Sequence, residues 1–197
     1  VVLRHESQDL RMILRDMLRF STNLTAEMVG LAATQKRLGV VDGLQGSAAE
    51  MNRWAVATLD MRAPALVDHS GLGDASTLTA LDMTRALLAV KDAGFRSILK
   101  RFGFRDAKGR PVKDQAVAVD AKTGTLNFVS TLAGYMTAQD GREMAFAIFA
   151  SDMTARAKVT RAQREAPAGG RTYNKRAKRV QQGLLERWDA LYGRLDA

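Results

Sequence analysis

The sequence contains no cysteine and only two histidines, His5 and His69, among its 197 residues. Without cysteine the chain has no disulfide and no thiolate, and its redox compartment stays open. Two histidines are too few for a histidine-rich metal site or a histidine-based catalytic triad, so we expect neither a metal nor another cofactor. Aromatic residues make up 6% of the chain and methionine occurs nine times, which predicts an adaptable core.

Long apolar runs are also missing, since no stretch of the sequence is long enough to span a membrane and no signal-peptide pattern is present. The chain starts at Val1, and its first helical pattern follows almost at once. We therefore interpret it as a piece of a longer protein, whose preceding part would carry any export signal. A length of 197 residues allows one good core.

Acidic residues are scarce toward the end of the chain. Residues 154–197 hold eleven Lys or Arg against four Asp or Glu, which accounts for +7 of the net charge of +9. One interpretation is a patch for a wall polymer, a membrane surface or nucleic acid. The other is a solvated linker, which the run Ala-Pro-Ala-Gly-Gly at 166–170 favours. Between Arg171 and Arg179 the only aromatic residue is Tyr173, and no nucleic-acid motif occurs, so no specific nucleic-acid partner is expected.

Patterns in the first hundred residues are mostly helical. Apolar residues repeat at helical spacing over 10–18 and 28–32, a capping box at 47–50 opens a helix to about Leu59, and Thr79 opens a helix that Gly94 stops. Between the last two helices, Ala65-Leu66-Val67 predicts a short buried strand that leads into a Ser70-Gly71 turn.

Patterns after residue 115 are extended and then helical. Three strands are predicted near 115–126, 128–137 and 143–151, with Asp140-Gly141 as the hairpin turn between the last two. A final amphipathic helix is predicted from Gln181 to Leu195. Its apolar stripe consists of Leu184, Leu185, Trp188, Leu191 and Tyr192.

These patterns predict an α/β fold of the α+β type, with an antiparallel sheet flanked by helices. We divide the chain into a helical region plus three strands at 1–153, a basic linker at 154–180 and a C-terminal helix at 181–197.

The most informative stretch is Lys-Thr-Gly-Thr at 122–125, within the first predicted strand. On an edge strand it would offer an ammonium, two hydroxyls and a glycine that lets a ligand approach the backbone. Those groups suit a substrate that ends in a carboxylate and binds as an added strand. The alternative is that Lys122 merely protects a sheet edge against aggregation.

A second polar motif, Ser21-Thr22-Asn23, lies between the first two helical patterns. In a tight turn it would project a hydroxyl and an amide from rigid supports, although the same residues also serve as ordinary helix caps. Ser-x-Asn followed by Lys-Thr-Gly is the motif order of penicillin-recognising serine enzymes.

With both motifs placed, the chain resembles the C-terminal part of the D-alanyl-D-alanine carboxypeptidase/endopeptidases, the class C low-molecular-mass penicillin-binding proteins of the peptidase S13 family. The matching pieces are residues 21–28, 66–72, 121–126 continuing to 132–135, 140–142 and the strand 144–149. They cover most of residues 7–152 in the family's order. The resemblance implies the C-terminal half of the penicillin-recognising transpeptidase/β-lactamase fold, and the basic tail after Asp152 has no counterpart in it.

The family's third motif, the Ser-x-x-Lys that supplies the nucleophile, is missing from its expected place. The only match, Ser97-Ile98-Leu99-Lys100, comes after Ser-x-Asn and is flanked by Arg96 and Arg101. We interpret it as a surface helix in which Ser97 and Lys100 share a face by chance. The nucleophile is then expected on a missing N-terminal segment or a complementary chain. This chain alone is expected to be inactive and to associate or aggregate.

The resemblance assigns roles to residues at both motifs. It implies catalytic roles for Ser21, Asn23 and Lys122 and substrate binding by Thr123, Gly124 and Thr125. Ser21 would pass a proton to the leaving amine with Lys122 tuning it, and Asn23 would hold the substrate or the nucleophile's lysine. Thr123 and Thr125, with Lys122, would grip the terminal carboxylate. The Thr125 N–H would join the oxyanion hole. For Asp68, His69 and Ser70, a structural turn is expected.

The function so implied is a serine-type D-Ala-D-Ala carboxypeptidase/endopeptidase that cleaves peptidoglycan stem peptides through an acyl-enzyme, in the periplasm or cell envelope, with β-lactams as inhibitors. One alternative is a non-catalytic penicillin-binding-like remnant or subunit. Another is a basic nucleic-acid or membrane-surface module that depends on the tail.

Overall fold

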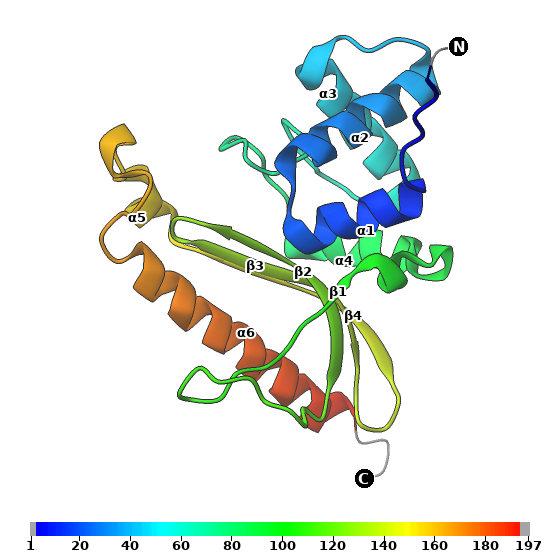
Figure 1. Cartoon of the computed structure of the whole chain (residues 1–197). Coiled ribbons are helices and arrows are strands. Elements are labelled where there is room, and N and C mark those ends of the chain that lie inside the picture. The colour runs from blue at the N-terminus through cyan, green and yellow to red at the C-terminus, as the bar shows by residue number, and fades with distance from the viewer. Residues whose placement is uncertain (1–2, 194–197) are drawn as a thin grey trace. The chain divides into compact units, whose positions relative to one another are not determined.

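The computed structural model describes residues 3–193. The chain divides into two compact units, residues 1–100 and 101–197, which are described separately (Figure 1). The first unit is helical and the second contains a sheet with a long helix. The combination of an antiparallel sheet with helices confirms the predicted fold class.

Helices make up the ordered part of unit 1. They are α1 (Leu10–Phe20), α2 (Asn23–Leu38), α3 (Gly43–Leu59), α4 (Ala80–Ala89) and two short 3₁₀ helices, η1 (Lys91–Ala93) and η2 (Phe95–Ile98). Thr79 caps α4 as predicted, because its hydroxyl accepts a hydrogen bond from the N–H of Asp82 at 3.0 Å. The helix ends at Ala89 rather than near Gly94, and η1 fills the interval.

Ser47 does not begin a helix, contrary to the predicted capping box. Helix α3 starts at Gly43, and Ser47 lies buried inside it. Its hydroxyl bonds with Thr34 Oγ1 at 2.7 Å and with His69 Nε2 at 2.8 Å. The Ser47 side chain, which the local pattern predicted to cap a helix, therefore forms tertiary hydrogen bonds instead.

Ala65-Leu66-Val67 is not a buried strand. Ala65 forms one isolated bridge with Thr77, and the main chain of Leu66 pairs with a side chain, since Asn52 Nδ2 donates to its carbonyl and Asn52 Oδ1 accepts from its N–H. The side-chain amide of Asn52 therefore makes the hydrogen bonds that a neighbouring strand would make. The apolar triplet alone gives no sign of this distant partner.

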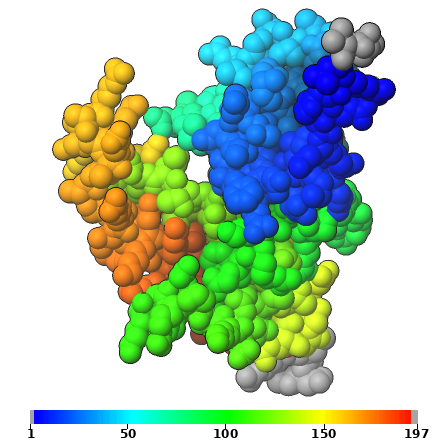
Figure 2. All heavy atoms as spheres, viewed as in Figure 1, coloured from blue at the N-terminus to red at the C-terminus, as the bar shows by residue number. Residues whose placement is uncertain are grey.

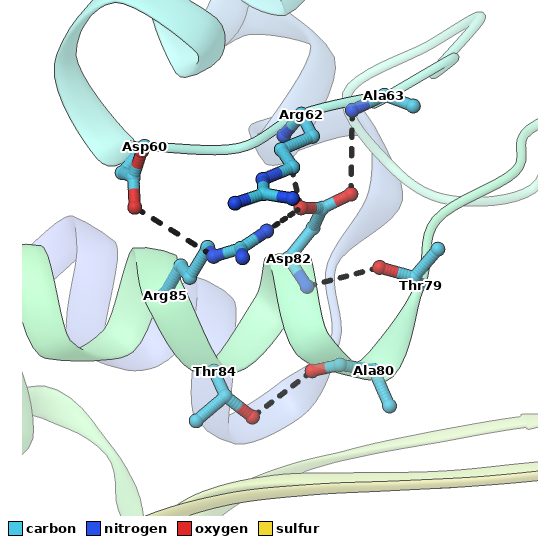
Figure 3. A network of polar contacts seen from close by, with 8 residues as sticks. All are labelled: Asp60, Arg62, Ala63, Thr79, Ala80, Asp82, Thr84 and Arg85. Carbon is cyan, nitrogen blue, oxygen red and sulfur yellow. Dashed lines mark hydrogen bonds and ion pairs between the residues drawn. The ribbon is translucent and has the colours of Figure 1, made fainter.

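A buried carboxylate joins α4 to the segment after α3 (Figure 3). Asp82 accepts hydrogen bonds from the N–H groups of Arg62 at 2.9 Å and Ala63 at 3.3 Å, and it pairs with Arg85 at 3.2 Å. Arg85 also pairs with Asp60, the left-handed C-cap of α3, at 3.6 Å. The hydrogen bond from Arg62 N–H is the main cause that lowers the pKa of Asp82.

Unit 2 is built on a sheet of order β1-β2-β3-β4, in which β1 lies at the boundary between the units. The strands are β1 (Lys100–Arg101), β2 (Ala118–Leu126), β3 (Val129–Thr137) and β4 (Glu143–Ser151). The three long strands confirm the prediction. So does the Asp140-Gly141 turn between β3 and β4, where Gly141 takes a positive φ of 87°.

Helix α6 (Gly170–Tyr192) packs on the sheet over β3 (Figure 1). Alternate residues on the strands face the helix. The buried apolar cluster of this unit consists of Phe104, Val117, Val119, Ala121, Leu132, Met136, Phe146, Ile148 and Leu185. Lys122 directly follows Ala121 of this set in the strand alternation, which places it on the opposite face of β2.

Helix α6 begins eleven residues before its predicted start at Gln181. The predicted linker, residues 154–180, therefore contains the start of α6, together with most of α5 (Met153–Ala157) and η3 (Arg161–Gln163). The first turns of α6 contact the sheet through Tyr173, Asn174 and Ala177, which include a polar and a small side chain and form no apolar stripe. Periodicity alone therefore missed them.

The far end of α6 also differs from the prediction. Leu191 and Tyr192 are exposed, whereas Gln181 and Asp189 are buried. Asp189 accepts hydrogen bonds from the N–H and the Nε2 of Gln139, both at 2.9 Å. Residues 194–195 of the predicted helix lie outside the described residues. None of the helices within 3–193 is long and apolar enough to cross a membrane.

Candidate functional site

The Ser-x-Asn motif forms the turn between α1 and α2, as predicted. Ser21 is the C-cap of α1 in the left-handed conformation, with φ 54° and ψ 49°, and Asn23 is the first residue of α2. Left-handed backbone costs a non-glycine residue about 1 kcal/mol. Both side chains are exposed. One rigid turn therefore presents a hydroxyl and an amide two residues apart.

One helical turn after Asn23, Glu27 holds the loop 68–73 against α2. Its carboxylate accepts hydrogen bonds from the N–H groups of His69 at 3.2 Å and Ser70 at 2.9 Å. Burial alone would raise the pKa of Glu27, but these bonds and one with the Ser70 hydroxyl outweigh burial and lower it. Asp68 closes the loop by accepting from the N–H groups of Gly71 and Gly73.

The His69 ring fits against α2 because residue 30 is glycine. A Cβ on Gly30 would lie 2.1 Å from the ring. The ring bonds with Ser47 Oγ at 2.8 Å and contacts the sulfur of Met51 at 3.2 Å. His69 therefore anchors a structural turn, as expected for this loop. Across residues 3–193, no three His, Cys, Asp or Glu side chains form a group that could hold a metal ion.

The Lys-Thr-Gly-Thr motif lies in the second half of β2, also as predicted. The Lys122 ammonium is half-buried and donates to the carbonyl of Thr123 at 2.5 Å, and its desolvation lowers its pKa. Thr123 and Thr125 are exposed and alternate with Lys122 along the strand. A ligand along the edge of β2 would thus lie between an ammonium on one face and two hydroxyls on the other.

Gly124 packs closely against its partner on β3. It is paired with Thr131 on β3, and a Cβ at this position would lie 2.4 Å from Thr131 Oγ1. Its absence makes room for that side chain. Gly124 therefore has a packing role on the face that Lys122 shares, and its role in letting a substrate approach the backbone stays a prediction.

The outer edge of β2 is only partly covered within the described sheet. Strand β1 has two residues, whereas β2 has nine. Phe102 N–H donates to Val119 O at 2.8 Å, and Arg101 pairs with Asp120 at 3.1 Å, so β1 lies beside the first half of β2. The half that contains Lys122 to Thr125 lies beyond β1 and has no strand paired to its outer edge within the described sheet.

Ser97 and Lys100 do not form a nucleophile pair. Ser97 lies in η2, Leu99 is extended with ψ 156°, and Lys100 begins β1, so the surface helix expected here is a 3₁₀ turn followed by a strand. The Ser97 hydroxyl donates to Gly94 O at 2.8 Å and accepts from Arg11. The interpretation of this Ser-x-x-Lys as a chance match is consistent with that geometry.

The predicted site residues therefore fall into two groups. Ser21 and Asn23 share a turn in unit 1, and Lys122 to Thr125 share a strand in unit 2. That the two groups face one cleft stays a prediction. Sequence reasoning gave no role to Glu27, although a Glu one turn after Asn23 on a helix was visible in the sequence.

Comparison with known proteins covers most of the chain. Residues 1–170 match the model of the family described as "D-Ala-D-Ala carboxypeptidase 3 (S13) family". No curated protein matches the chain. The family match ends at the first residue of α6.

Solved structures resemble the chain over a similar extent. Penicillin-binding protein 4 from Haemophilus influenzae, complexed with a β-lactam, is 25% identical with a TM-score of 0.62 over 75% of this chain and 36% of that one. A predatory endopeptidase from Bdellovibrio bacteriovorus in complex with an immunity protein is 24% identical, with a TM-score of 0.51 over 88% of this chain and 43% of that one.

A second Bdellovibrio bacteriovorus endopeptidase, acylated by penicillin G, is 18% identical with a TM-score of 0.51 over 88% of this chain and 45% of that one. The two endopeptidases show the fold alone. This chain spans less than half the length of each of these three proteins.

Proposed function

This chain belongs to the D-Ala-D-Ala carboxypeptidase 3 (S13) family, and from that premise we propose that it is the C-terminal part of a serine peptidase acting on peptidoglycan stem peptides in the periplasm or cell envelope. The observation that carries the proposal is the pair of motifs on rigid supports: Ser21 and Asn23 in the turn between α1 and α2, and Lys122 on a partly open strand. The similar penicillin-binding protein 4 was solved with a β-lactam bound, which supports penicillin as a probe.

In the proposed reaction, a serine on a segment outside residues 1–197 attacks the peptide carbonyl, and a neighbouring lysine takes its proton. The carbonyl carbon forms an ester with that serine, and the D-alanine amine leaves with a proton passed through Ser21. Water then cleaves the ester. Lys122, Thr123 and Thr125 hold the terminal carboxylate, and the Thr125 N–H stabilises the oxyanion at about 3 kcal/mol.

Exposed apolar side chains around the Ser21 turn support a missing segment. Phe20 is 66% exposed, Leu24 77% and Met28 58%. Leu24 and Met28 are one turn apart on α2 and therefore share a face. We propose that the segment with Ser-x-x-Lys covers this face, which would bring the attacking serine beside Ser21 and Asn23.

Labelling with a fluorescent penicillin tests the function on the complete protein. Covalent labelling of the unmodified protein is expected, with loss of at least a hundredfold in labelling rate for Lys122→Ala, because the carboxylate loses its cation. Lys113→Ala, which changes an exposed lysine before β2, is the matched control and should label normally. Unchanged melting temperatures would show that Lys122→Ala remains folded.

The other outcomes discriminate the alternatives. Normal labelling of Lys122→Ala would remove Lys122 from the mechanism. No labelling of the unmodified complete protein would favour a non-catalytic remnant or subunit. The supporting observation for that alternative is that Ser97 lies in a 3₁₀ turn and Lys100 in a strand, so they do not share a helix face.

A further inference from the structure

The excess positive charge of the chain is concentrated on one ordered segment of unit 2. Between residues 157 and 180, eight exposed cations occur with one acidic residue, Glu165. We call these eight the basic surface: Lys158, Arg161, Arg164, Arg171, Lys175, Arg176, Lys178 and Arg179. None of their side chains has an ion-pair partner within the described part of the chain. Their charges are therefore available to an external anion.

This segment is fixed to the sheet and is not a loose linker. Asn127, in the turn between β2 and β3, donates from Nδ2 to Arg164 O at 2.6 Å and accepts at its carbonyl from Arg156 at 3.0 Å. Tyr173 packs on Phe128 with ring centroids 6.0 Å apart. In Figure 2 the amber and orange atoms of α5, η3 and the start of α6 form one continuous surface. The cations are thus held in place before any ligand binds.

The shape of the basic surface favours binding to a flat, extended anionic surface over binding to a nucleic-acid strand in a groove. Its cations spread over two short segments and around the outer side of α6 rather than lining a channel. The nearby hollow, which includes Arg105 and Arg179, is also lined by Asp106 and Glu186, whose carboxylates disfavour a phosphate. The only aromatic ring between 157 and 180, Tyr173, is engaged by Phe128, so no ring is free to stack on a base.

Exposed apolar side chains lie at both ends of the segment. Met153, at the start of α5, is 58% exposed, and Val180, on α6, is 60% exposed. Cations combined with exposed apolar groups are the composition of segments that bind at the interface of an anionic bilayer.

We propose that the basic surface docks on a membrane that contains anionic phospholipids. The contact is peripheral, since the buried face of α6 stays on the sheet. Docking would also orient the strand with Lys122 to Thr125, because Asn174 Nδ2 on α6 donates to Leu126 O at 2.9 Å, at the end of that strand. Most of α6, with five of the eight cations, lies beyond the family match at residues 1–170.

Co-sedimentation of the 1–197 chain with vesicles tests the proposal without any catalytic activity. Phosphatidylcholine vesicles in which one third of the lipid is phosphatidylglycerol should bind the chain, and vesicles of phosphatidylcholine alone should not. Each cation near the surface contributes about fivefold to partitioning at low salt. The triple variant Lys175→Glu, Lys178→Glu, Arg179→Glu loses three cations and gains three anions, so it should bind at least on the order of a hundredfold more weakly. Added salt should weaken the binding of the native chain to the vesicles.

A variant with the same change in net charge is the matched control. Lys36→Glu, Lys91→Glu and Lys113→Glu alter exposed lysines outside the basic surface and should leave binding within about threefold of native at the same salt. Circular dichroism should show native helicity for both triple variants. If the first triple variant unfolds, Lys175→Gln, Lys178→Gln and Arg179→Gln take its place, with a loss on the order of a hundredfold expected at low salt.

Three results would overturn the proposal. The first is no binding of the native chain to the anionic vesicles. The second is equal loss in both triple variants, which would mean that net charge alone acts. The third is tighter binding to polyphosphate or duplex DNA than to the vesicles, which would assign the basic surface to a polymer.

Discussion

Unit 1 and unit 2 are stabilised by different means. Unit 2 contains a cluster of nine buried apolar residues between its sheet and α6, whereas the corresponding cluster of unit 1 has three, Ala55, Met61 and Ala86. Unit 1 relies more on buried carboxylates than unit 2, where Asp189 is buried: Glu50 pairs with Arg37 at 3.0 Å and Arg53 at 2.8 Å, and Asp82 holds the start of α4.

The difference teaches how the two halves of the proposed site are positioned. The strand with Lys122 is supported by an apolar core that unit 2 supplies within itself. The Ser21 turn is supported by α2, which depends on directional bonds such as those of Glu27 and leaves Leu24 and Met28 exposed. We infer that unit 1 depends more strongly on whatever covers it.

The chain offers a separate reporter for each unit. Its two tryptophans are Trp54 in α3 and Trp188 in α6. Trp54→Phe leaves a fluorescence signal from unit 2, and Trp188→Phe leaves one from unit 1. Urea unfolding of these two backgrounds therefore measures the units separately in one polypeptide.

The largest effect is expected from the core of unit 2. Leu132→Ala empties space at a fully buried position and should lower the free energy of unfolding by about 3 kcal/mol. The unfolding transition monitored by Trp188 should shift to a lower urea concentration, and the transition monitored by Trp54 should shift much less. Leu191→Ala, at an exposed position of α6, is the control and should change stability by less than about 0.5 kcal/mol. Equal shifts of both transitions would mean that the units unfold together.

A smaller, pH-dependent effect is expected in unit 1. The two carboxylate oxygens of Asp82 accept separately from the N–H groups of Arg62 and Ala63, and Asp82→Asn replaces one of them with an NH₂ group. The substitution should therefore destabilise the unfolding transition monitored by Trp54. Because the folded pKa of Asp82 is lowered, chiefly by the Arg62 N–H, its contribution is present above the unfolded pKa and disappears as pH falls through the folded pKa.

The gap between native protein and Asp82→Asn in urea midpoint should therefore narrow as the solution is acidified from neutral pH. Asp92→Asn, an exposed residue of η1, is the matched control and should leave the midpoint unchanged. A gap that stays constant down to pH values below the ordinary carboxyl range would show that Asp82 acts through its shape and not its charge.

The smallest effect is expected at the strand of the site. Gly124→Ala places a Cβ against Thr131 Oγ1 and should cost about 1 kcal/mol in the Trp188 transition. Thr131→Ala in the same chain should restore most of that loss, so a double-mutant cycle measures the contact. Without rescue, the cost would lie in the backbone of β2 rather than in this pair.

Local patterns predicted the elements whose signal is strong. The alternation in β2 to β4 and the turn at Ser21 to Asn23 were visible because period and turn residues agree there. The early start of α6 and the burial of Ser47 were missed, since both rest on contacts with distant residues, such as Asn174 with Leu126 and Ser47 with His69. The contact of Gly124 with Thr131 was missed for the same reason, because Thr131 lies across the strand pair.

By itself the sequence determined the family, the two polar motifs and the strands and turn that hold them, because spacing along the chain is enough to specify local geometry. Only the tertiary structure decided that Glu27 holds the 68–73 loop, that Lys122 is half-buried on a strand that β1 pairs only in part, and that the basic segment is anchored to the sheet. Burial and hydrogen-bond partners depend on residues far apart in the chain, and no local pattern encodes them.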